Sequence, residues 1–75
     1  MEPLEYCRKW VTIPPEQRGW RKASIVALMK ATGLNESTIS NWGKDFERRP
    51  DSVLRTLDLA DKLNTIHRIL LNLDL

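Results

Sequence analysis

The stretch "TGLNESTISNW", residues 32–42, predicts how the middle of this chain is organised. A glycine and an apolar residue come first, and a run of short polar residues follows. Gly33 suits the left-handed position that ends a helix, and Asn35 is a favoured residue for starting the next one. We therefore predict two helices joined by a tight turn, the second running from about 35 to 44.

The second helix of this pair has one apolar side and one polar side. Ile39, Trp42 and Phe46 make a single stripe at helical spacing, which is typical of core residues. The opposite side carries short polar side chains and one lysine: Glu36, Ser37, Thr38, Ser40, Asn41 and Lys44. Such a side can lie close in the major groove of DNA, where donors and acceptors meet base edges. The alternative is that the polar residues of the first turn only cap and solubilise the helix.

The segments before the turn also have helical patterns. A first helix is predicted at about 3–12, and Pro14 must end it because proline lacks an amide hydrogen. The helix before the turn either runs from 15 to 31 or begins near 21, after Gly19. No run of residues makes a convincing β pattern, so the chain is predicted to be helical.

A long final helix is predicted at about 52–72. The sequence thus indicates one all-α domain over 1–75, a small bundle of four to five helices with a helix-turn-helix at about 21–44. Apolar residues in the second part of the final helix are spaced by four and three, which is a heptad pattern. They form what we call the apolar seam: Leu59, Leu63, Ile66, Leu70 and Leu73. The seam predicts a homodimer or another protein partner, unless it folds back onto Tyr6 and Trp10.

Composition excludes several classes of protein. The chain of 75 residues has a net charge of +2, with 41% hydrophobic and 29% charged residues, as in ordinary globular domains. The single cysteine cannot form an internal disulfide, and no Cys/His cluster suggests zinc. Neither a signal peptide nor a membrane span is evident, so we expect a cytoplasmic protein. No catalytic set or phosphate loop is visible, so we expect no enzyme, cofactor, metal or small-molecule substrate.

A longer part of the sequence carries a family resemblance. "SIVALMKATGLNESTISNWGKDFERRPDSVLRTLDLADKL" resembles the helix-turn-helix domain of lambda-repressor-like and Cro-like phage regulators. The resemblance rests on Gly33 with Leu34, "STIS" at 37–40, "RRP" at 48–50 and "LDLADKL" at 57–63, and it covers a little over half of the chain. It implies a regulator that binds double-stranded DNA through the second helix of the motif.

The resemblance also implies roles for particular residues. Base-reading positions fall on Glu36, Ser37 and Asn41, with Thr38 and Ser40 beside them. An asparagine can contact adenine through two hydrogen bonds, and a glutamate can accept one from cytosine. Phosphate-binding positions fall on Arg21, Lys22, Lys44, Arg48 and Arg49. The alternative for these cations is a solvated cluster without a partner.

Three functions are therefore compatible with the sequence. The first is a DNA-binding transcriptional regulator that acts as a homodimer through its last helix. The second is a protein-interaction module that keeps a helix-turn-helix fold and binds a partner through the apolar last helix. The third is a small structural or regulatory helical protein with no role in nucleic-acid binding.

Overall fold

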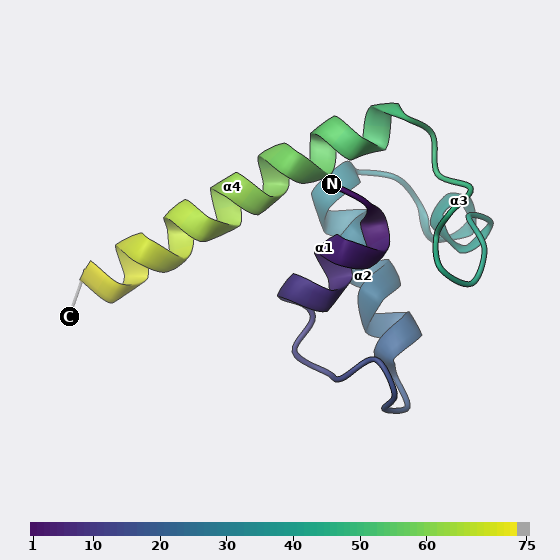
Figure 1. The fold of residues 1–75 in the computed structure, drawn as a ribbon, viewed down its shortest axis with the longest axis horizontal. Coiled ribbons are helices and arrows are strands. Elements are labelled where there is room, and N and C mark those ends of the chain that lie inside the picture. Colours follow the sequence, from purple (N-terminus) through teal and green to yellow (C-terminus); the bar gives the residue numbers. More distant parts are fainter. Residues whose placement is uncertain (74–75) are drawn as a thin grey trace.

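The computed structural model describes residues 1–73, which fold into four helices (Figure 1). These are α1 (Pro3–Trp10), α2 (Trp20–Thr32), α3 (Glu36–Ser40) and α4 (Ser52–Leu73). No strand occurs within this described part of the chain. The all-α class, the small bundle and the long C-terminal helix are thereby confirmed for residues 1–73, while the last two residues of the predicted domain lie outside the described range.

Helix α1 is shorter than the predicted range of about 3–12. Pro3 occupies its first turn, where the missing amide hydrogen has no partner to lose. Val11 already has an extended backbone (φ −83°, ψ 127°), although its amide still donates to the carbonyl of Cys7. Pro14 has no amide hydrogen to donate to the carbonyl of Trp10 and disfavours helical backbone at Ile13, so the helix does not reach Thr12.

Helix α2 begins at Trp20, which excludes the longer alternative starting at 15. Turns occupy residues 15–19, and Gly19 precedes the helix in a left-handed conformation (φ 97°). At the other end Gly33 is also left-handed (φ 75°), and its amide donates to the carbonyl of Met29. Gly33 is therefore the C-terminal cap that the sequence predicted.

Helix α3 begins as predicted and ends earlier than predicted. Its N-cap is Asn35, whose Oδ1 accepts a hydrogen bond from the amide of Thr38 at 2.9 Å. The helix stops at Ser40 rather than near 44, because the amide of Trp42 donates to the carbonyl of Ile39 in a tighter turn. Gly43 then turns the chain with a positive φ of 97°.

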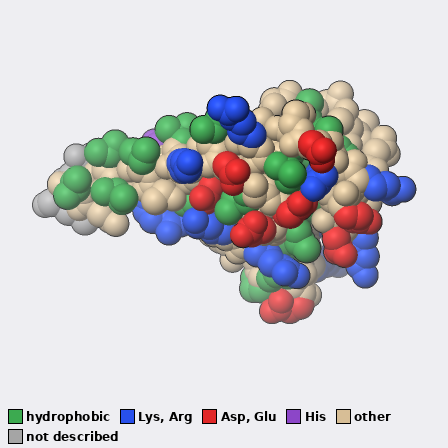
Figure 2. Space-filling view, turned by 45° about the horizontal axis from the view of Figure 1, so that its top comes forward, with side chains coloured by type: hydrophobic (Ala, Val, Ile, Leu, Met, Phe, Trp, Pro, Cys, Tyr) green, Lys and Arg blue, Asp and Glu red, His purple; other side chains and the backbone are tan. Residues whose placement is uncertain are grey.

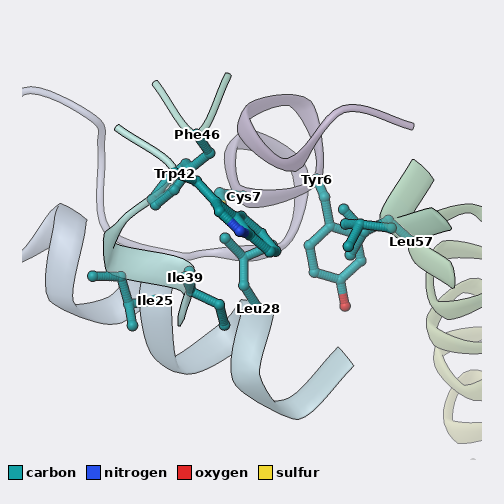
Figure 3. Close-up of a cluster of buried hydrophobic side chains, with 9 residues drawn as sticks. Tyr6, Cys7, Ile25, Leu28, Ile39, Trp42, Phe46 and Leu57 are labelled. Carbon is teal, nitrogen blue, oxygen red and sulfur yellow. The ribbon is translucent and has the colours of Figure 1, made fainter. Parts of the chain in front are cut away.

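The core lies where α1, α2, α3 and the first part of α4 meet (Figure 3). Its buried hydrophobic residues are Tyr6, Cys7, Ile25, Leu28, Ile39, Trp42, Phe46, Val53 and Leu57. The stripe of Ile39, Trp42 and Phe46 is thus in the core, as predicted. Phe46 reaches it from a left-handed backbone (φ 58°), which is costly for a residue with a side chain, so packing of its ring must outweigh that strain.

Helix α4 packs on the core with its first part and extends beyond the other helices with its second part (Figure 1). Two side-chain hydrogen bonds fix its middle: the indole of Trp10 donates to Asp61 at 2.9 Å, and the Asn64 amide donates to the hydroxyl of Tyr6 at 2.9 Å. The apolar seam does not fold back onto the rest of the chain. Its side chains are 54% (Ile66) to 73% (Leu73) exposed.

Candidate nucleic-acid interface

The exposed polar residues of α3, together with Asn41 directly after it, make up what we call the α3 surface. It contains the five residues predicted to contact bases: Glu36, Ser37, Thr38, Ser40 and Asn41, all of them exposed. Beneath them Ile39 is fully buried against α2. A short helix with a buried anchor and a side-chain cap at its start holds such polar groups in a fixed arrangement.

Asn41 occupies the residue that follows α3. Its backbone is helical (φ −74°, ψ −5°), and its amide donates to the carbonyl of Ser37 at 3.1 Å. Within residues 1–73 its side-chain amide makes no hydrogen bond, and neither does the carboxylate of Glu36. Their donors and acceptors are therefore available to a ligand.

Arg21 organises the loop that follows α3. Its guanidinium donates to the carbonyls of Ser40 (3.2 Å), Gly43 (3.2 Å) and Lys44 (3.1 Å). The same group lies 5.0 Å above the ring of Phe46, a cation–π distance. Arg21 thus ties α2 to the loop, an arrangement that the sequence did not predict. Its predicted phosphate contact stays a prediction.

Arg49 is also engaged by its own chain. Its Nε and Nη2 donate to the two carboxylate oxygens of Glu2 at 3.0 and 2.8 Å, and Nη1 donates to Asp51 at 3.0 Å. The hydrogen bond from Arg49 lowers the pKa of the Glu2 carboxyl, and the same bond raises the pKa of Arg49. This bidentate ion pair between Arg49 and Glu2 joins the N-terminus to the loop before α4. The role of Arg49 at a phosphate also stays a prediction.

Three predicted cations remain unpaired in the described part of the chain. Lys22, Lys44 and Arg48 are exposed and form no salt bridge within residues 1–73. The α3 surface also has acidic neighbours, Asp45 and Glu47, in the loop that follows it. Glu47 accepts a hydrogen bond from the amide of Asp45 at 3.0 Å, and hydrogen bonds from its own and the Asp45 amide lower its pKa. The charge around the surface is therefore mixed.

A second surface lies between α2 and α4. A groove of about 360 Å³ separates the C-terminal part of α2 from α4, and we call it the α2–α4 groove. Its lining includes Ala31 on one side and Thr56, Leu59 and Leu63 on the other. The remaining seam residues continue the same side of α4 past the groove. Figure 2 shows hydrophobic side chains gathered on the projecting part of the helix.

Within residues 1–73, no group of three or more His, Cys, Asp or Glu side chains is placed to hold a metal ion. None of the described helices combines the length and apolarity needed to cross a membrane. Comparison with protein-family models, with curated proteins and with solved structures yields no match to this chain.

Proposed function

We propose that this chain is a transcriptional regulator that binds double-stranded DNA through the α3 surface. The observation that supports this most is that the five predicted base-contacting side chains, four on α3 and one on the residue that follows it, are all exposed, while Ile39 of the same helix is buried. The cap at Asn35 and the Arg21 clamp hold this helix and its following loop in place. Preorganised short donors and acceptors are what base-edge recognition in the major groove requires.

The proposal assigns different tasks to the residues around α3. Asn41 and Glu36 would contact base edges, and Ser37 would contact either a base or a phosphate. Lys22, Lys44 and Arg48 would contact phosphates, which fix register without carrying sequence information. The family resemblance to phage regulators favours this division of tasks. The proposal includes residence in the cytoplasm and no catalytic activity.

Association of two chains is the second part of the proposal. A single small domain makes few DNA contacts, and a symmetric pair of chains can occupy two half-sites of an operator. The apolar seam on the projecting part of α4 supports association, because several large hydrophobic side chains there are more than half exposed. Exposed apolar surface of this kind commonly marks a protein interface.

A second candidate function is a protein-interaction module on the same scaffold. The observation favouring it is the mixed charge at the α3 end, where Glu36, Asp45 and Glu47 accompany the cations. Acidic groups near a phosphate backbone weaken binding unless each meets a donor on a base. This function would use the projecting part of α4 and leave the α3 surface without a ligand.

An NMR titration of the labelled protein with a mixed-sequence DNA duplex distinguishes these functions. We expect the amides of residues 37–44 and of Arg48 to shift at low salt, and the shifts to shrink as salt increases. Asn41→Ala should reduce discrimination between DNA sequences by about tenfold or more, the worth of one bidentate base contact. Asn72→Ala is the matched control, because Asn72 is an exposed asparagine on the projecting part of α4.

Two results would count against DNA binding. One is the absence of shifts around α3 at low salt, which would leave the interaction module as the better proposal. The other is an equal loss of DNA affinity for all sequences in the Asn41→Ala and Asn72→Ala variants. Asn41 would then have no role in distinguishing one DNA sequence from another.

A further inference from the structure

The second part of α4 presents an apolar face that its own chain leaves uncovered. The groove-lining residues Thr56, Leu59 and Leu63 and the projecting residues Ile66, Leu70 and Leu73 follow each other at spacings of three and four. All six therefore lie along one side of the helix. Three of them line a hollow, and the other three extend into solvent beyond it.

The groove-lining set and the projecting set face each other when two copies of α4 pack antiparallel. In an antiparallel pair with its two-fold axis between residues 64 and 65, Thr56 lies opposite the partner's Leu73. Leu59 then lies opposite the partner's Leu70, and Leu63 opposite the partner's Ile66. A two-fold interface requires a surface that is complementary to itself, and this arrangement supplies it.

We infer that two copies of this chain associate through antiparallel α4 helices, so that the projecting part of each helix fills the α2–α4 groove of the other. The inference rests on the association included in the proposed function and adds its occupant and orientation. The two grooves, each of about 360 Å³, are filled at the same time by symmetry. The groove-lining residues of each helix thus contact the projecting residues of the other.

The exposed area is sufficient for such a pair. The five seam residues are each more than half exposed, so ten large aliphatic side chains are available in the pair. Covering them removes on the order of 1,000 Å² from water, which is about the lower bound for a specific interface. The partner helix also covers the partly exposed Ala31 in the groove lining, which adds to this area.

The basic side chains beside the apolar seam favour the antiparallel orientation. Lys62 and His67 stand at the positions that flank the apolar seam. In a parallel pair, Lys62 would face the partner's His67, which sets two basic groups together. In the antiparallel pair Lys62 lies near the partner's Ile69 and His67 near the partner's Ala60, so neither faces another basic side chain.

Sedimentation of the full chain without DNA tests the association. We expect the wild-type chain to change from monomer to dimer as its concentration increases. Ile66→Asp should weaken dimerisation by at least about tenfold, because it places a charge at the centre of the interface. Leu71→Asp is the matched control: Leu71 is 59% exposed on the same part of α4 but off the seam, so dimerisation should stay within about twofold.

Disulfide cross-linking tests the orientation. A chain with Leu59→Cys and a chain with Leu70→Cys should cross-link when mixed, because these positions are opposite each other. Neither should cross-link alone, since identical positions would be about 16 Å apart along the axis. The native Cys7 is fully buried, and burial raises its pKa to about 11, so the wild-type chain serves as the unreactive control.

The outcomes separate the claims from one another. A chain that stays monomeric at all concentrations overturns the inference and the association within the proposed function. DNA binding by the α3 surface is then judged by the NMR titration alone. Cross-linking of Leu70→Cys by itself, without the Leu59→Cys chain, overturns the antiparallel orientation while association stands.

Discussion

The two parts of α4 have similar apolar content and different surroundings. Residues 52–64 contribute Val53 and Leu57 to the core and receive hydrogen bonds at Asp61. Residues 65–73 contain no buried side chain. The comparison teaches that a periodic apolar pattern identifies which residues share a side of a helix and does not identify what covers that side.

The two parts also depend on each other. A helix of nine residues is unstable alone in water, because starting a helix costs more than a short one recovers. The packed first part of α4 provides the helical nucleus, and the helix continues from it into the projecting part. The projecting part therefore keeps its helical form through continuity with the packed part, and covering its apolar side would stabilise it further.

The largest expected difference between the two parts comes from truncating one leucine in each. Leu57→Ala should lower the free energy of unfolding by about 2–5 kcal/mol, because Leu57 is completely buried. Leu70→Ala should change it by less than about 0.5 kcal/mol when the protein is dilute, because Leu70 is 56% exposed. Denaturant unfolding at low protein concentration measures both. Similar losses for the two variants would show that the projecting part is covered even in the monomer.

A smaller difference in stability is expected between the alanine variants of two asparagines. Asn64→Ala should cost about 1 kcal/mol, since the half-buried Asn64 amide donates to the hydroxyl of Tyr6. Asn72→Ala removes an exposed asparagine from the projecting part and should leave stability nearly unchanged. Thermal unfolding of both variants makes the comparison. An equal shift for the two would mean that the hydrogen bond to Tyr6 contributes nothing measurable.

The smallest effect is a dependence on pH at Asp61. Hydrogen bonds, first from Lys9 and then from Trp10, lower the pKa of this carboxyl from its ordinary value of 3.8. The stabilisation is therefore present above that value and is lost as the pH falls through the lower folded-state pKa. The indole proton resonance of Trp10, followed from pH 5 downwards, should report this loss. In Asp61→Asn that pH-dependent change should be absent, and its persistence would assign the change to another carboxyl.

Local chemistry is what made much of the fold predictable. Gly33 as a left-handed cap and Asn35 as an N-cap depend only on neighbouring residues, and both predictions are confirmed. The stripe of Ile39, Trp42 and Phe46 is likewise confirmed as core. The end of α3 was predicted too late because the left-handed turn at Gly43 overrides the helical spacing that continues through it.

The surroundings of the cations could not be predicted, because they depend on contacts distant in sequence. Arg21 binds carbonyls of residues 40–44, and Arg49 binds Glu2 at the other end of the chain. Neither partner follows a spacing that sequence analysis can recognise. The exposed polar positions of α3 were easier to predict, because a buried residue every third or fourth position implies exposed ones between.

The position of Trp10 has a consequence for optical measurements. The Arg68 guanidinium lies 4.5 Å and the Lys9 ammonium 5.5 Å from the centre of its ring, while its indole nitrogen donates to Asp61. Arg68 belongs to the projecting part of α4, and Asp61 to the packed part. The emission of Trp10, one of three tryptophans in the chain, is therefore sensitive to both parts of α4 and would change with a bend between them.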